Sequence, residues 1–256
     1  MNTIQIAVQD RLATITLDRG RANSINLEMI AELNSAVKDL SADRAVNGLI
    51  ITGKESFFSA GIDLIEAYNY NEIQSRELWT EFLTLQANLI ALPKPFVAAI
   101  SGHSPAGGCV MALCSDYRVM ASGKFIIGLN EIPVGIIVPD IIFNLYAFWL
   151  GERKAYQYLL EGKLLSVEEA LTSGLVDEVC EPAELLAIAE KKVRFYMKQN
   201  AVTWRQSKLN MRAKLISQFR ADFTASLDMM LKQWWAPETR QGLQLMIENL
   251  KSPATK

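Results

Sequence analysis

Residues 96–120 read FVAAISGHSPAGGCVMALCSDYRVM, and this run predicts a strand, a helix and a second strand in succession. Phe96–Ile100 is a short apolar segment, typical of a strand buried on both faces. Ser104 and Pro105 have the residue types of an N-cap and a first-turn proline, so a helix is expected to begin there. Tyr117–Met120 resumes the strand pattern. Residues 95–115 carry no Asp, Glu, Lys or Arg, but their prolines and glycines favour a buried strand and helix over a membrane span.

The alternation of strands and helices continues on the N-terminal side. Residues 4–8 and 12–17 alternate apolar and polar side chains and predict two antiparallel strands. Asn26 is expected to cap a helix, and Leu49–Ile51 is a short apolar run that predicts a buried strand. A further helix is expected over residues 71–92. Together these elements predict an α/β fold with mostly parallel pairing.

The C-terminal side changes character. Ser166 and Glu169 form a capping box at the start of a short helix that Gly174 should end, and a strand is expected at residues 175–176. Beyond about Pro182 only helical patterns follow, the last of them opened by Pro237. We therefore expect a core over residues 1–195 and a helical region over residues 196–256.

Composition and charge exclude several classes of protein. The 256 residues are 50% hydrophobic, enough for a full core, and the net charge of −2 favours neither nucleic acid nor an anionic membrane as a partner. The N-terminus lacks the basic and apolar regions of a signal peptide. Three cysteines without close spacing indicate reduced thiols, so a cytoplasmic location is expected.

Several kinds of catalytic site lack support in the sequence. Gly102–Ala106 resembles a nucleophile elbow, but that chemistry needs a later histidine, and His103 is the single histidine of the chain. His103 is therefore expected to be structural. One histidine and scattered cysteines predict no metal site. Neither a dinucleotide-binding glycine motif nor a P-loop is present.

A different kind of site is indicated by two small-residue turns and one carboxylate. Ala106–Gly108 falls at an expected helix start, where unpaired N–H groups and the helix dipole favour negative charge, although close packing alone also explains such glycines. Ser59–Ile62 is a second turn of this type. Glu131 lies in the apolar stretch 128–135, where a carboxylate is costly unless it is paired or catalytic. The combination suggests a thioester enolate site with a single acid/base.

A late cluster of basic residues has two interpretations. A solvated helix face is the simpler one, and a phosphate contact is the functional one. The cluster comprises Arg205, Lys208, Arg212 and Lys214.

Four segments in order resemble the crotonase (enoyl-CoA hydratase/isomerase) family. They are Asp18–Ile25, Phe58–Leu64, Pro105–Cys109 and Ala170–Val176. The resemblance implies a crotonase-like spiral of ββα units with a C-terminal helical appendage, an acyl-CoA ligand, and assembly as a homotrimer or a dimer of trimers. It also implies an oxyanion hole formed by the backbone N–H groups of Ile62 and Gly107. The residues expected to contact substrate are Ala22, Ser59, Ala60, Gly61, Asp63 and Asn130.

The resemblance also indicates the reaction. Hydratases of the family carry two glutamates, and this chain has Val110 at the first position and Glu131 at the second. A single acid/base is typical of Δ3,Δ2-enoyl-CoA isomerases of fatty-acid oxidation, which need no cofactor beyond the coenzyme A of the substrate. Alternatives are another acyl-CoA enzyme such as an enoyl-CoA hydratase, or an RNA-binding member, which a pI of about 5.6 disfavours. Trp234 and Trp235 could anchor a subunit interface or pack within the chain.

Overall fold

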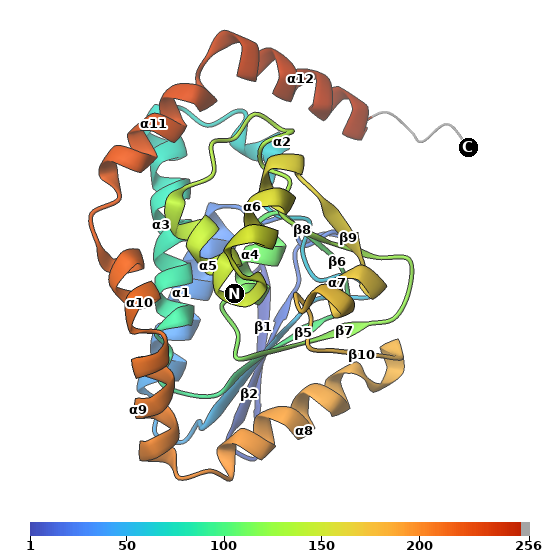
Figure 1. Ribbon diagram of the computed structural model, residues 1–256, viewed down its shortest axis with the longest axis vertical. Helices are drawn as coiled ribbons and strands as arrows, with labels where there is room; N and C mark the ends of the chain where they lie inside the picture. Colours follow the sequence, from blue (N-terminus) through green and yellow to red (C-terminus); the bar gives the residue numbers. More distant parts are fainter. Residues whose placement is uncertain (252–256) are drawn as a thin grey trace.

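A six-stranded sheet forms one layer of the molecule, as the computed structural model of residues 1–251 shows (Figure 1). Its order is β1-β2-β3-β5-β7-β10; only β1 and β2 pair antiparallel, and the other neighbours pair parallel. The strands are β1 (Ile4–Gln9), β2 (Leu12–Leu17), β3 (Gly48–Thr52), β5 (Phe96–Ile100), β7 (Tyr117–Ala121) and β10 (Glu178–Cys180). The expected α/β class with mostly parallel pairing is confirmed.

A second sheet of four strands has the order β4-β6-β8-β9. Its strands are β4 (Ser56–Phe57), β6 (Gly102–Pro105), β8 (Ile126–Gly128) and β9 (Leu164–Ser166). Along the chain β3 is followed by β4, β5 by β6 and β7 by β8, and helices follow each pair. This repetition is the ββα pattern that the resemblance implies.

Helices cover both faces of the larger sheet. In chain order they are α1 (Leu27–Ala42), α2 (Leu64–Ala67), α3 (Glu72–Ile90), α4 (Gly107–Leu113), α5 (Asp140–Leu150), α6 (Glu152–Glu161), α7 (Val167–Ser173), α8 (Leu185–Met197), α9 (Ala201–Met211), α10 (Ala213–Arg220), α11 (Thr224–Trp234) and α12 (Pro237–Lys251). Side chains of α8 pack on one face, as Val193 does beside Val97. The main core lies on the other face, between the sheet and α1, α3 and α4.

Local capping signals gave correct helix starts. Asn26 accepts a hydrogen bond from the Met29 N–H, and reciprocal capping boxes begin α3 at Asn71 and α7 at Ser166. Each side-chain cap satisfies an N–H group that has no acceptor inside the helix.

Two boundaries were predicted wrongly. Ser104 and Pro105 belong to β6, and α4 begins two residues later at Gly107, because residues 104–105 find a strand partner in β8. The segment 175–176 is not a strand, because both of its N–H groups donate to the carbonyl of Ala170 in α7. The strand begins at Glu178 instead.

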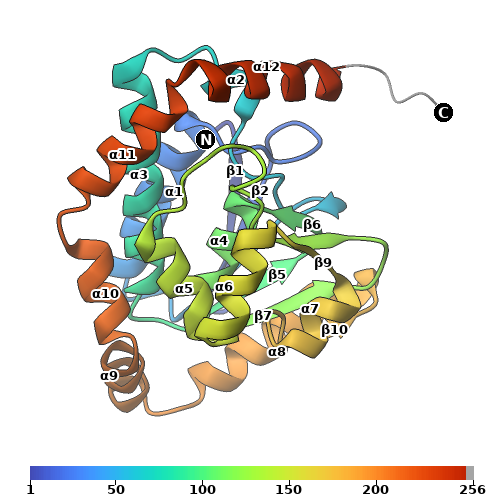
Figure 2. The ribbon, with the colours of Figure 1, turned by 45° about the horizontal axis from the view of Figure 1, so that its top comes forward.

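The last helices pack against the core. Figures 1 and 2 show α10 and α11 along α3, and α12 beside α2. Trp234 is buried with its ring centroid 6.3 Å from that of Trp79. Packing within the chain therefore accounts for Trp234. No helix in residues 1–251 is long and apolar enough to cross a membrane.

Candidate active site

Two backbone N–H groups without an intrachain acceptor lie at neighbouring turns. The Ile25 N–H donates to Gly61 O and the Asp63 N–H donates to Ile25 O, each over 2.8 Å, so the N–H of Ile62 between them points away from Ile25. Gly107 is the first residue of α4, where an N–H has no helical acceptor. Within residues 1–251, neither N–H donates to another group of the chain. A Cβ built on Gly61 would lie 3.0 Å from Gly107 N, so the two turns are in contact.

The Ser59–Ile62 turn is held in place by hydrogen bonds to the segment of Ala22 and Asn23. The buried Ser59 hydroxyl donates to Asn23 O over 2.8 Å and accepts from the Gly61 N–H over 3.2 Å. The Ala60 N–H donates to Ala22 O over 2.9 Å, which joins two expected substrate-binding segments. Gly61 has φ +84°, a conformation that favours glycine.

Asp63 follows the same turn, and its side chain binds other groups of the protein. Its carboxylate accepts from the Glu66 N–H and so caps α2, and it pairs with Arg19 over 2.7 Å. The side chain is thus engaged within the protein. Its expected contact with substrate stays a prediction, as do those of Ala22, Ser59, Ala60 and Gly61.

Glu131 supplies the carboxylate of the site. It opens the turn after β8, and its carbonyl accepts hydrogen bonds from the Val134 and Ile136 N–H groups. The Oε2 atom is buried without a hydrogen-bond partner. Burial disfavours the charged form and raises the pKa of Glu131 to about 7. Near neutral pH such a group can both remove and return a proton.

The turns and the carboxylate meet at one cavity of about 230 Å³. Ile62, Gly107, Asn130 and Glu131 all line it. Val110, which is 2% exposed on the first turn of α4, lines it too. Among the described residues that form its wall, Glu131 is the only one with an ionisable side chain. The cavity therefore combines two hydrogen-bond donors with a single acid/base.

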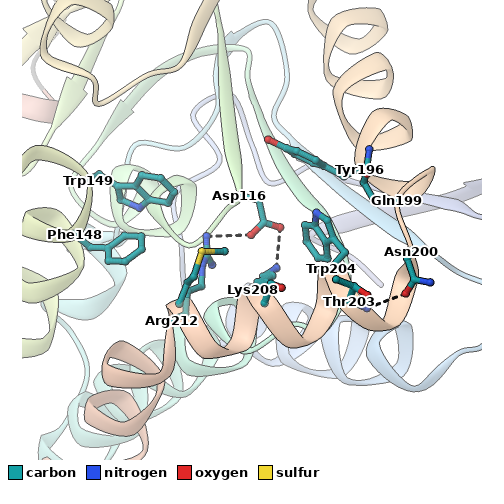
Figure 3. Close-up of a pocket in the computed structure, with 12 residues that line it drawn as sticks. Asp116, Phe148, Trp149, Tyr196, Gln199, Asn200, Thr203, Trp204, Lys208 and Arg212 are labelled. Atoms are coloured by element: carbon teal, nitrogen blue, oxygen red, sulfur yellow. Dashed lines mark hydrogen bonds and ion pairs between the residues drawn. The ribbon is translucent and has the colours of Figure 1, made fainter.

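A larger cavity of about 580 Å³ lies elsewhere, beside α9 and α5 (Figure 3). Lys208 Nζ lies 2.8 Å from Asp116 Oδ2, and Arg212 Nη2 lies 3.1 Å from Asp116 Oδ1. The Arg212 guanidinium also donates to Cys114 O and Ser115 O. These charges are buried and satisfied by the protein itself, so they brace α9 against the core.

The ion pairs of Asp116 with Lys208 and Arg212 correct the interpretation of the basic cluster as a solvated helix face. A solvated face describes Arg205 and Lys214, which are exposed, but is wrong for Lys208 and Arg212. Their spacing of four residues, which puts both on one helix face, was the only signal of a shared partner. The partner, Asp116, lies 92 residues before Lys208.

His103 has a structural role, as expected. Its ring packs between Phe57 and Phe125, with centroid distances of 5.0 and 5.1 Å. Its Nδ1 accepts a hydrogen bond from the Ile126 N–H over 3.2 Å. Within residues 1–251, no group of three or more His, Cys, Asp or Glu side chains could hold a metal ion.

Other cavity residues were missed in the sequence. Trp79 and Phe82 come from α3, Met230 from α11 and Met246 from α12. Each fits the apolar face of an amphipathic helix, so nothing in the sequence separates it from an ordinary core position.

Comparison with known proteins agrees with this fold. The enoyl-CoA hydratase/isomerase family matches residues 7–255, and the chain belongs to that family. The crystal structure of human mitochondrial delta3-delta2-enoyl-CoA isomerase superposes with a TM-score of 0.94 at 28% identity, covering 97% of this chain and 98% of that one.

Two curated relatives carry different activities in their names. Mouse enoyl-CoA delta isomerase 1, mitochondrial, is 41% identical over 170 residues, which are 66% of this chain. The match spans 59% of the length of that mouse relative. A probable enoyl-CoA hydratase of Rhizobium meliloti (strain 1021) is 33% identical over 198 residues, covering 75% of this chain and 76% of the relative.

Gly108→Ala is expected to disrupt the paired turns. A Cβ at Gly108 would lie 2.4 Å from the backbone oxygen of Ser59, so the first turn must move away from α4. Since loss of one oxyanion donor costs about 10²–10³-fold in kcat, we expect at least about a 10²-fold loss. Steady-state kinetics and circular dichroism measure activity and folding. Gly242→Ala is the control, because nothing lies within 4 Å of its Cβ. Unchanged kcat in Gly108→Ala would contradict the geometry.

Proposed function

We propose that this protein is a Δ3,Δ2-enoyl-CoA isomerase that moves a double bond of an acyl-CoA from C3 to C2. The observation that carries the proposal is the presence of one ionisable side chain, Glu131, in a cavity with two free N–H groups. Proton transfer from C2 to C4 needs one group that acts first as base and then as acid. A pKa of about 7 suits both roles.

The proposed reaction begins with the thioester oxygen held by the N–H groups of Ile62 and Gly107. Glu131 removes a proton from C2, and the electrons of that C–H bond delocalise into a dienolate whose negative oxygen the two N–H groups stabilise. Protonated Glu131 then delivers the proton to C4, which leaves the double bond between C2 and C3. Asn130, which lines the cavity beside Glu131, would orient the base or the substrate.

The substrate supplies its own coenzyme A, and no further cofactor is required by this chemistry. We assign the pantetheine that adjoins the thioester to the segment where Ala22, Ala60 and Gly61 meet. The hydrogen bond that joins the backbones of Ala22 and Ala60 supports this placement, as does the absence of a side chain at Gly61.

The test is a panel of 3-enoyl-CoA and trans-2-enoyl-CoA substrates. The wild type should isomerise the former and add little water to the latter, because Val110 leaves the cavity without a second carboxylate. Val110→Glu should gain a trace of 3-hydroxyacyl-CoA formation, and Val110→Leu serves as a control of similar bulk. Hydration by the wild type as efficient as its isomerisation would contradict the isomerase assignment and favour the hydratase alternative, which the Rhizobium relative's name supports.

The pH dependence should follow the ionisation of Glu131. Because the base must be deprotonated in the free enzyme, we expect kcat/KM to fall about tenfold per pH unit below about pH 7. An ordinary glutamate would place this fall near its usual pKa of 4.5. Initial rates from pH 5 to 9 measure this pH dependence, with any coupling enzyme present in excess at every pH. A flat profile across pH 5–8 would contradict burial as the cause of the pKa shift.

Assembly and location complete the proposal. A homotrimer or a dimer of trimers is proposed from the family resemblance, and light scattering at micromolar concentration tests it. Cys109, Cys114 and Cys180 are free thiols, which supports a reducing compartment. That compartment is either the cytoplasm or a mitochondrion, as in the name of the mouse relative.

A further inference from the structure

Part of the cavity lining is apolar and comes from helices outside the two turns. Trp79 and Phe82 of α3, Ile142 of α5, Met230 of α11 and Met246 of α12 line it. If the proposed function holds, the thioester lies at the paired turns, so the acyl chain must extend along these side chains. The C-terminal helices thus form part of the acyl-binding wall.

This wall is held in place by contacts at the start of α12. The Arg240 guanidinium donates to Tyr68 O over 2.6 Å and lies 3.6 Å from the centroid of the Tyr68 ring. Tyr68 is the C-cap of α2, the helix that directly follows the Ile62 turn. The Gln233 side chain donates to the Thr239 hydroxyl over 2.8 Å, joining α11 to α12. The position of Met246 is therefore coupled to the turn that would bind the thioester.

The cavity volume limits what the wall can enclose. An apolar cavity of about 150 Å³ holds benzene, with its six carbons. By the same ratio, the 230 Å³ here accommodates about nine non-hydrogen atoms. The thioester carbon and oxygen occupy two of these positions, which leaves room for about seven further carbons.

We infer that Met230 and Met246 set an upper limit on acyl chain length, and that the enzyme acts on short and medium chains of about six to eight carbons. This inference rests on the proposed function. Since even one methylene that an apolar pocket cannot accommodate costs about tenfold or more, chains of about twelve carbons are disfavoured by at least about tenfold unless the two methionine side chains are shortened.

The experiment compares kcat/KM for 3-enoyl-CoAs of increasing chain length in the wild type, Met246→Ala and Met230→Ala. For the wild type, we expect kcat/KM to be at least about tenfold lower with twelve carbons than with eight. In each alanine variant, the ratio of kcat/KM for twelve carbons to that for eight should rise about tenfold. Met246→Trp fills the cavity and should shift the preference toward the shortest chain. Met246→Trp thus changes the chain-length preference in the opposite direction to the alanine variants. It tests the inference even if an alanine variant folds poorly.

Neighbouring residues provide matched controls. Met229 is 61% exposed beside the buried Met230, and Leu245 is 56% exposed beside Met246. Met229→Ala and Leu245→Ala remove similar side chains from the same helices without touching the cavity. Both should keep the wild-type dependence on chain length.

Competition by saturated hexanoyl-, octanoyl- and dodecanoyl-CoA, followed by calorimetry, separates the two possible failures. If no 3-enoyl-CoA is isomerised but these ligands show the same length limit and the same shift in Met246→Ala, the proposed function fails and the inference stands. If wild type handles twelve carbons as well as eight, or if the Met246 variants leave the length dependence unchanged, the inference is overturned while the isomerase proposal stands.

Discussion

Glu131→Gln is expected to lower kcat for 3-enoyl-CoA isomerisation by about 10²–10⁴-fold, the usual contribution of a positioned acid/base. The amide keeps the size of the side chain but cannot take up the C2 proton. Binding of a saturated acyl-CoA should change little, because the proposed thioester contacts come from the backbone of Ile62 and Gly107. Single-turnover kinetics measure the loss in the chemical step, and calorimetry measures the binding of the saturated acyl-CoA.

The same substitution should stabilise the folded protein at alkaline pH. The pKa of Glu131 is about 7 in the folded state, above its ordinary value of 4.5. Between these values the folded state keeps a proton that the unfolded chain releases, so the free energy of unfolding falls as pH rises. The penalty above pH 7 amounts to about 3 kcal/mol, and glutamine removes it.

Denaturant unfolding at pH 5 and pH 8 measures this gain. Glu131→Gln should exceed the wild type in stability at pH 8 and come close to it at pH 5, because pH 5 is only just above the ordinary pKa of 4.5 and most of the penalty develops between there and pH 7. Wild-type activity in the variant would disprove the catalytic role. A stability difference that does not depend on pH would disprove the buried, perturbed carboxyl.

Asp116→Ala is expected to lower the free energy of unfolding by about 3–5 kcal/mol, because it leaves the buried charges of Lys208 and Arg212 without their counterion. The carboxylate also accepts a hydrogen bond from the Phe96 N–H at the start of β5. The loss should therefore loosen the contact between α9 and the central sheet. Chemical denaturation at neutral pH measures the change.

Asp228→Ala is the matched control for this prediction. The Asp228–Arg76 pair is also a short ion pair, at 2.6 Å, but both side chains are about half exposed. Exposed pairs contribute at most about 1 kcal/mol. A second comparison is Asp116→Asn, which keeps an acceptor for the Phe96 N–H but removes the negative charge, and it should also be destabilising because the charges of Lys208 and Arg212 lose their counterion. Equal effects of Asp116→Ala and Asp228→Ala would show that burial of the first pair is energetically unimportant.

The sequence by itself determined what depends on neighbouring residues. Apolar runs such as Phe96–Ile100 gave the strands, Asn26 and Ser166 gave helix starts, and Gly174 gave a helix end. The exceptional position of Glu131 was visible as one carboxylate in an apolar stretch. Each of these signals arises from the chain's own local hydrogen bonds or from the hydrophobicity of a short segment.

Only the tertiary structure decided which distant segments meet. It brought Gly61 against Gly107, buried Lys208 and Arg212 on Asp116, and placed Met246 in the wall of the cavity. It also extended β6 through Pro105, because β8 offered that segment a partner. From sequence alone, a charged side chain is predicted to be exposed and a methionine to belong to the core. Only the neighbours in the folded structure show whether either prediction is correct. The free energy of burying either one depends on groups tens to hundreds of residues away in the sequence, which no local pattern encodes.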